Sequence, residues 1–300
     1  MVLGLLTALF WGGADFLIRL LGARMSLRGS LVWTQGIAAA IILCVSLASG
    51  HIPYAGLDPS ALPMLATAAV ASAAGLGLLF LAFQNGRVAV VAPLTGSYAI
   101  VATLIGLIIG TEALSIPLLA AILFISLGAS LVMFHDEEGS GHRPGIGATA
   151  ALASALASGI AIWLTVTFVL PEVAVTDILL TNFTLLALAA LFWGRRPEIG
   201  LPANGATWLL IGGIAIGTVA GYGAYNVGLS RNGIAVVSVL STLSSAVTVF
   251  LAAMIGKEKV GRTQRLGIAI IILGLPLLAT FREIASRSAP YQWNQTLGSM

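Results

Sequence analysis

The chain has 300 residues, of which 58% are hydrophobic and 8% are charged, and its formal net charge at pH 7 is +3. Soluble domains carry about 25% charged residues, and a soluble fold of this length cannot bury so much apolar surface. The few basic residues lie mostly between apolar runs, which indicates membrane flanks and argues against a nucleic-acid-binding face. A single cysteine, Cys44, excludes an internal disulfide and a cysteine-based metal site. The composition predicts an integral membrane protein.

Ten apolar runs are long enough to predict membrane-spanning helices, which need about 20 residues at 1.5 Å each. The first five are Val2–Leu21, Ser30–Leu47, Ala61–Phe83, Val88–Ile109 and Pro117–Phe134. The last five are Ile146–Val169, Val175–Phe192, Ala206–Leu229, Ile234–Ile255 and Leu266–Phe281. The first run lacks a basic leading segment and is too long for a signal peptide.

The longest charged loop separates the two sets of five runs. We therefore predict an all-α integral membrane protein with a first five-helix repeat at residues 1–137 and a second at 146–281. A polar connecting loop occupies residues 138–145, and a polar C-terminal tail occupies 282–300. Because five is an odd number, the second repeat would enter the membrane from the opposite side, which gives an inverted repeat.

Direct evidence of duplication comes from residues 88–128, which align without a gap with residues 234–274. Of the 41 aligned positions 12 are identical, among them Glu112 and Glu258. Two unrelated apolar stretches would share fewer positions, and a polar residue at the same place in both copies makes coincidence a poor explanation. Internal duplication is common among membrane transporters.

Polar residues in the first run recur every four positions, at Thr7, Trp11, Asp15 and Arg19, so they share one helix face. Two readings of Asp15 remain open. It pairs with Arg19 one turn away, as a neutralised residue near the end of the span, or it serves as a carboxylate that couples transport to an ion or proton.

The eighth run combines a glycine ladder, at Gly213, Gly217 and Gly221, with a polar and aromatic stripe. The stripe consists of Thr218, Tyr222, Tyr225 and Asn226. The glycines permit close helix packing, and the stripe fits either a solute cavity or hydrogen bonding between helices.

The remaining polar groups lie on the fourth, sixth and ninth runs. Pro93 removes a backbone donor in the fourth run and precedes Thr95 and Tyr98. The ninth run carries Ser244, and Trp163 lies near the middle of the sixth, away from the usual interfacial position of tryptophan. The predicted substrate-binding residues are Trp11, Thr95, Tyr98, Trp163, Tyr222, Tyr225, Asn226 and Ser244, and Asp15 is the coupling candidate.

The sequence lacks the residues that several classes of enzyme require. All three histidines, His51, His135 and His142, lie in loops, so no Ser–His pair is available within the membrane. Metalloprotease, prenyl-transferase and phosphate-binding motifs are absent. We expect no enzyme activity, no cofactor and no metal.

Three short motifs resemble the drug/metabolite transporter superfamily, in its ten-helix EamA type. They are Trp11-Gly12 in the first run, the sequence NGRVAVVAPL that leads into the fourth, and the G-x-E ends of the fourth and ninth runs. The resemblance covers nearly all of residues 1–281 and is greatest to aromatic amino-acid exporters. The second repeat departs from the pattern, because Ser154-Ala155 stands where the Trp-Gly pair is expected and Val239 where the first repeat has Pro93.

The resemblance implies a solute cavity lined by the first, third, fourth, sixth, eighth and ninth helices, and export of amino acids by alternating access. It also implies cytoplasmic termini. The charge pattern disagrees, since eleven of the 14 Lys and Arg residues fall on the side opposite the termini, which the positive-inside rule places in the cytoplasm. The orientation stays open.

We expect a secondary transporter that exports small metabolites, such as aromatic or other neutral amino acids, from a bacterial cell across its inner membrane. Its partners are the solute and the lipid bilayer, no nucleic acid is involved, and a monomer is plausible. Two alternatives stay open, a membrane scaffold without a transport cycle and an exporter of drugs and organic cations.

Overall fold

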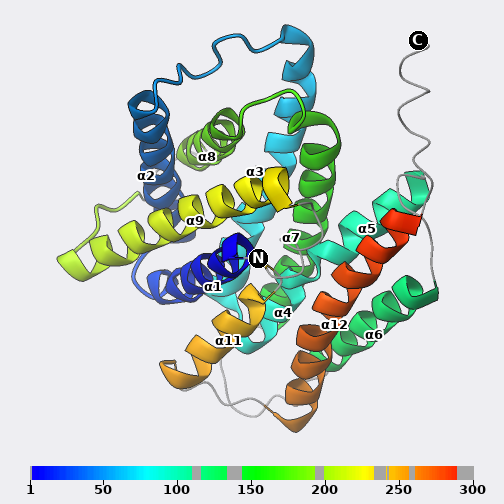
Figure 1. The fold of residues 1–300 in the computed structure, drawn as a ribbon. Helices are drawn as coiled ribbons and strands as arrows, with labels where there is room; N and C mark the ends of the chain where they lie inside the picture. Colours follow the sequence, from blue (N-terminus) through cyan, green and yellow to red (C-terminus); the bar gives the residue numbers. More distant parts are fainter. Residues whose placement is uncertain are drawn as a thin grey trace.

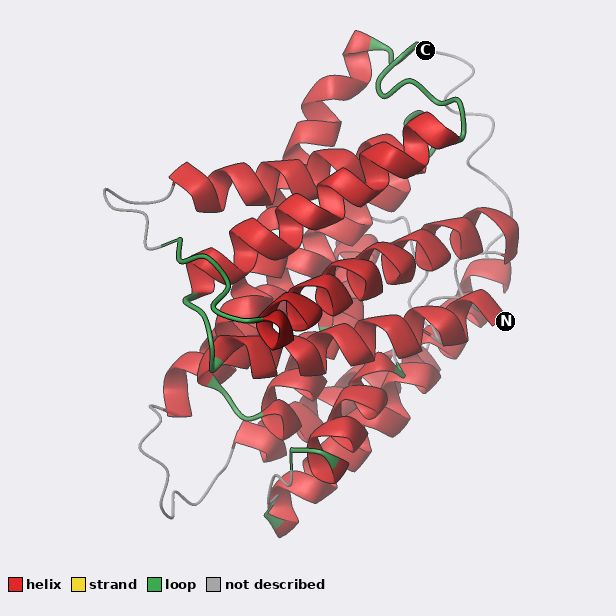
Figure 2. Ribbon diagram, turned by 90° about the vertical axis from the view of Figure 1, so that its left-hand side faces the viewer, coloured by secondary structure: helices red, strands yellow, loops and turns green. Residues whose placement is uncertain are grey.

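The structure, a computed structural model, describes residues 2–109, 116–133, 144–192, 199–232, 241, 243–256 and 261–288. In these residues all regular structure is helical (Figure 2). The helices are α1 (Val2–Gly22), α2 (Leu27–Ala48), η1 (Pro59–Ala61), α3 (Leu62–Asn85), α4 (Val88–Gly96), α5 (Tyr98–Ile109), α6 (Ile116–Met133), α7 (Pro144–Leu164), η2 (Thr165–Val169), α8 (Val175–Phe192), α9 (Gly205–Asn232), α11 (Ser244–Met254) and α12 (Arg262–Ser288).

Within the described residues, seven helical segments are long and apolar enough to cross a membrane. They are Val2–Gly22, Leu27–Ala48, Pro59–Asn85, Val88–Gly106, Gly145–Val169, Val175–Phe192 and Gly205–Gly228. Two shorter apolar helices, Ser244–Met254 and Arg265–Gly274, lie within the ninth and tenth predicted runs. Large apolar side chains such as Ile108, Phe192 and Leu209 are exposed on the outside of the bundle, which suits contact with lipid.

The fourth predicted run is not one helix, because the chain changes direction at Ser97. Pro93 lies inside α4 and supplies no backbone N–H to the helix. Ser97 has φ −71° and ψ 1°, outside the α-helical region, and its hydroxyl donates to the carbonyl of Pro93 at 3.2 Å. The result is a discontinuous helix whose break lies in the interior of the bundle.

The sixth predicted run ends at Val169 as expected but differs in the type of its last helical turn, and the tenth ends later than expected. The sixth run continues from α7 into η2, a short π-helical segment of a kind that is frequent at functional sites. Helix α12 begins at Arg262 and ends at Ser288, so the first part of the polar tail predicted at 282–300 is helical. Residues Glu112 and Glu258, which anchored the repeat alignment, lie outside the described residues.

The first helix of each predicted repeat packs mainly against helices of the other repeat. Helix α1 packs against α9 and α11, and α7 packs against α3, α4 and α5. Helices α2 and α8 form a pair across the repeats, and α6 and α12 form another, side by side in Figure 1. Exchanging the two predicted repeats turns the contacts of α1 into those of α7, and turns the α2–α8 and α6–α12 pairs into themselves.

Close glycine contacts repeat in the same way. A Cβ atom added to Gly12 would lie 2.6 Å from Cβ of Val247 and 2.7 Å from the carbonyl oxygen of Ser244. One added to Gly159 would lie 2.5 Å from Cβ of Val101 and 2.8 Å from the carbonyl oxygen of Tyr98. Val101 and Tyr98 are the aligned counterparts of Val247 and Ser244, so Gly159 is the counterpart of Gly12.

Hydrogen bonds give the same register. Ser154 donates to the carbonyl of Gly75 at 2.8 Å, and Thr7 donates to the carbonyl of Gly221 at 3.5 Å. Ser154 is therefore the counterpart of Thr7. The expectation that Ser154-Ala155 replaces the Trp-Gly pair was wrong, because the pair Ser158-Gly159 occupies that place.

Candidate functional site

A central cavity lies where the broken helix meets the crossing helices. It encloses about 730 Å³ of empty space, part of which is open to solvent. Seven helices contribute to its wall: α1, α3, α4, α5, α7, α9 and α11. Its lining residues are Trp11, Ala14, Asp15, Ile18, Leu76, Leu79, Thr95, Gly96, Tyr98, Ser154, Ser158, Ile162, Thr218, Tyr222, Ser244 and Ser245.

One part of the central cavity is aromatic. Trp11 of α1 and Tyr222 of α9 meet edge to face, with ring centroids 4.9 Å apart. Such a T-shaped pair is a favoured arrangement and fixes both rings. The close approach of α1 and α9 depends on Gly221, because a Cβ atom there would collide with the Trp11 ring. Tyr98, the first residue of α5, adds a third ring to the same lining.

Asp15 places a carboxylate in this lining. The sequence left open whether it pairs with Arg19, four residues further along α1. In the described chain the two residues form no ion pair, and Nη1 of Arg19 instead lies 3.5 Å from the carbonyl oxygen of Gln84 on α3. The Asp15 carboxylate shares this lining with Tyr98 and Tyr222.

Another part of the central cavity is lined by hydroxyl groups near the break in the fourth run. The hydroxyls of Thr95 and Ser245 both donate to the carbonyl of Ala92, each at 3.0 Å. Thr248, beneath this wall, donates to the carbonyl of Gly12 at 3.2 Å. With their protons committed to the backbone, the hydroxyl oxygens of Thr95 and Ser245 remain able to accept hydrogen bonds from a solute.

A second cavity, enclosing about 510 Å³ of empty space, adjoins the first. Its lining comes from α3, α7, η2, α8 and α9: Ser72, Ser158, Ala161, Ile162, Thr165, Val166, Ile178, Leu179, Asn182, Tyr222, Tyr225 and Asn226. Ser158, Ile162 and Tyr222 belong to both linings. The two cavities therefore meet at these side chains, near the middle of α7 and α9.

The loop between α2 and η1 is fastened to α8 beside the second cavity. Nε2 of His51 lies 3.0 Å from Oδ1 of the buried Asp177, and the hydroxyls of Tyr54 and Thr181 are 3.0 Å apart. Because Thr181 donates its proton to the carbonyl of Asp177 at 2.7 Å, Tyr54 is the donor to Thr181. These contacts join the first predicted repeat to the helix that supplies Ile178, Leu179 and Asn182 to the lining.

At its other end this loop leads into η1. The exposed Asp58 caps that helix, and its Oδ1 accepts a hydrogen bond from the backbone N–H of Ser60 at 2.9 Å. This hydrogen bond lowers the pKa of the Asp58 carboxyl.

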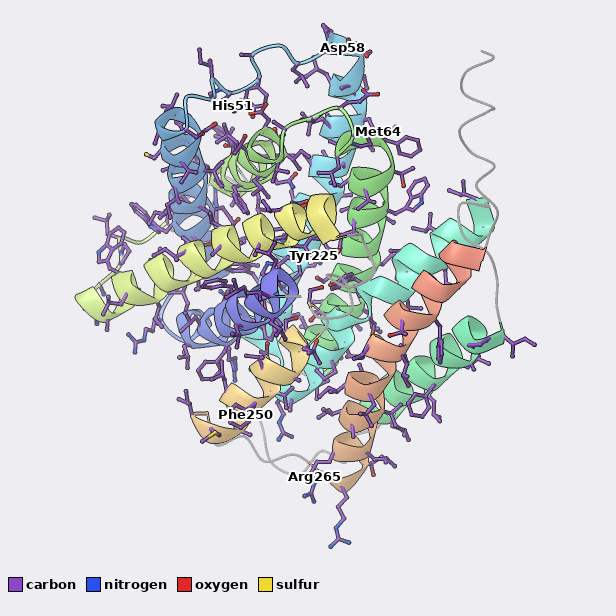
Figure 3. All side chains as sticks on the ribbon, viewed as in Figure 1. His51, Asp58, Met64, Tyr225, Phe250 and Arg265 are labelled. Carbon is purple, nitrogen blue, oxygen red and sulfur yellow. The ribbon has the colours of Figure 1, made fainter. Side chains whose placement is uncertain are left out.

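The structure brings most of the predicted site residues together. Trp11, Thr95, Tyr98, Ser244 and Asp15 line the central cavity, Tyr225 and Asn226 line the second, and Tyr222 lines both. Tyr225 lies inside the bundle (Figure 3), with its ring centroid 5.2 Å from that of Trp11. Trp163 lies outside both linings and packs edge to face on Phe168 at 5.4 Å.

Sequence reasoning missed the contribution of α7. Ser154, Ser158 and Ile162 follow each other at four-residue spacing and all line the central cavity. That spacing was visible in the sequence, but the prominent Trp163 drew the prediction to a different face of the same helix. In the described part of the chain, no three side chains of His, Cys, Asp or Glu gather as a metal site would require.

Comparison with known proteins places this geometry in context. Residues 145–280 match the EamA-like transporter family. A solved structure described as the crystal structure of a protein has a TM-score of 0.63 and 18% sequence identity, covering 94% of this chain and 97% of that chain. At this identity the likeness is one of fold. None of the curated proteins compared with the chain matches it.

The seven apolar helical segments of the described residues are those of a multi-pass membrane protein, and its residues 145–280 are similar to the EamA-like transporter family.

Proposed function

We propose that the protein is a secondary transporter that exports small, partly apolar solutes, with aromatic and other neutral amino acids as the first candidates. The observation that carries the proposal is the central cavity, which lies inside an apolar bundle and meets the second cavity at Tyr222. The transporter family match over residues 145–280 supports the same class. The membrane we propose is the inner membrane of a bacterium.

The lining suits such solutes. Small-molecule sites commonly combine apolar walls with a few polar groups. Here the rings of Trp11, Tyr98 and Tyr222 offer stacking surfaces, while Thr95 and Ser244 offer hydrogen bonds from the facing wall. In the second cavity Asn226 donates to the carbonyl of Tyr222 at 2.9 Å and retains an amide oxygen for a solute.

The proposed architecture is ten spanning helices in two inverted five-helix repeats. The repeated glycine contacts and hydrogen bonds between equivalent helices support it. They also bear on the motion, which in this proposal is not a rocking of one five-helix half against the other. Since α1 packs with α9 and α11, and α7 packs with α3, α4 and α5, the moving units in alternating access would each contain helices from both repeats.

Proton coupling in this proposal is weak or absent, and the protein acts as a facilitator or exchanger. Of the described residues that line the two cavities, Asp15 alone carries a carboxylate, whereas proton relays in transporters use chains of such groups. Asp15 is the group on which any coupling would depend.

The test is flux through purified protein in liposomes loaded with labelled amino acids, with and without a pH gradient. We expect gradient-independent flux of aromatic or branched amino acids, strongly reduced in Tyr222→Ala. Trp163→Ala in the same assay decides whether Trp163 also contacts the solute. Uphill transport that requires a proton gradient would overturn the facilitator assignment, and absence of flux from folded protein would overturn the amino-acid assignment.

A membrane scaffold is the alternative from another class, and one observation favours it. Ser245 and Thr248 already form hydrogen bonds between helices, to the carbonyls of Ala92 and Gly12. If the polar side chains of the two cavity linings served helix packing alone, Tyr222→Ala and Asn226→Ala would lower expression and thermal stability, and liposomes with the wild-type protein would show no flux. Normal folding with lost flux assigns the residues to transport.

A further inference from the structure

One described residue sets the charge of the two cavity linings. Among the described side chains of their linings, Asp15 is an acid and none is Lys, Arg or His. A carboxylate within an apolar bundle is costly unless a positive partner neutralises it. The linings therefore offer Asp15 no basic partner while a solute is absent.

The nearest arginine in sequence is held elsewhere. Arg19 is one turn from Asp15, yet its guanidinium extends to the carbonyl of Gln84 at the end of α3. The packing at this end is tight, because a Cβ atom at Gly22 would collide with the Gln84 side chain. Arg19 thus contributes to the contact between α1 and α3, and the Asp15 carboxylate lines the cavity without pairing with it.

Aromatic rings share the lining with this carboxylate. Trp11 precedes Asp15 by one helical turn, and Tyr98 of α5 and Tyr222 of α9 line the same cavity. A carboxylate beside aromatic rings attracts a cation through both its charge and the negative faces of the rings. An anionic solute would meet repulsion from Asp15 and no compensating basic group.

We propose that the central cavity recognises a protonated amine, which binds at Asp15 among Trp11, Tyr98 and Tyr222 while the apolar remainder of the solute lies against Leu76 and Ile162. This inference rests on the proposed transport function and narrows its substrate class. Organic amines, and zwitterions that present an ammonium group, are preferred over carboxylic acids of the same shape. The expected preference is about tenfold or more, since hydrogen bonds to charged groups are commonly that strong.

The experiment compares three probes that share an indole ring and differ in the end group: tryptamine, indole-3-propanol and indole-3-propionate. Their affinities are measured by isothermal titration calorimetry on the full-length protein in detergent, for wild type, Asp15→Asn and Asp15→Glu. Asp58→Asn, which removes an exposed carboxylate outside the cavities, is the matched control.

We expect wild type and Asp58→Asn to bind tryptamine about tenfold more tightly than the alcohol and the acid. Asp15→Asn abolishes this preference, and Asp15→Glu retains part of it. Equal affinities for the three probes in wild type, or an unchanged preference in Asp15→Asn, would overturn the proposal. The probe comparison in wild type decides even where a variant does not fold.

The same data separate this inference from the function on which it rests. Wild-type protein that binds the alcohol or the acid as well as the amine, and that still moves amino acids in liposomes, refutes amine recognition and leaves transport standing. Protein that binds no probe and moves no amino acid refutes both.

Discussion

Replacing Gly12 by alanine tests the crossing of α1 and α11, on which the central cavity depends. The added Cβ atom would lie 2.7 Å from the carbonyl oxygen of Ser244, where ordinary contact begins at 3.4 Å, so α1 must retreat by 3.4 − 2.7 = 0.7 Å. A backbone carbonyl cannot rotate away as a flexible side chain does. Overpacking of this kind costs about 1–3 kcal/mol.

The matched control is Gly13→Ala, one residue further along α1, where an added Cβ atom meets nothing within 4 Å. Both variants gain the same helix propensity, about 1 kcal/mol for alanine over glycine, so their difference isolates the clash. We expect Gly12→Ala to be less stable than Gly13→Ala by about 1–3 kcal/mol, measured as the free energy of unfolding of purified protein by denaturing detergent. Equal stability of the two variants would refute the packing argument.

Three further outcomes are expected. Gly159→Ala should destabilise the protein as much as Gly12→Ala, measured in the same unfolding assay, because its contacts are the counterpart set. Arg28→Ala should lower the free energy of unfolding by about 1–2 kcal/mol, since the Arg28 guanidinium binds two carbonyls at the end of α8 at 2.8 and 2.7 Å. His51→Ala should release the loop after α2 from α8, so a cysteine placed at Asn182 in the second cavity should react faster with a thiol reagent, in a background that lacks the native cysteine.

Much of the fold followed from the sequence because long apolar runs leave few choices in a membrane. Helices α1, α2, α3 and α8 begin and end within a few residues of their predicted bounds. The break at Ser97 could not be placed, because Pro93 is also tolerated inside continuous membrane helices. The counterpart of Gly12 was also misplaced, at Ala155, because Gly159 is identified by its close contact with α5, which the sequence does not show.

Part of the site could be predicted, because polar residues that share one helix face are expected to meet those of other helices in the interior of the bundle. Trp11, Tyr98 and Tyr222 come from three helices and meet in one lining. Sequence patterns could not exclude Trp163, because the face that α7 presents to the cavity depends on its packing against α3. There a Cβ atom on Gly75 would collide with Ser158, and this close approach turns Ser158 toward the interior.

The proposed repeat also accounts for a one-sided cavity. The register that equates Gly12 with Gly159 also equates Trp11 with Ser158 and Asp15 with Ile162, and all four of these residues line the central cavity. The glycines are restricted by contact between backbones, whereas the side chains at the cavity are free of that restriction and differ in size and charge. A lining with full two-fold symmetry would offer a small solute two equivalent orientations. The pairing of a tryptophan with a serine, and of an aspartate with an isoleucine, removes this equivalence and favours the orientation in which the solute's positive end faces α1.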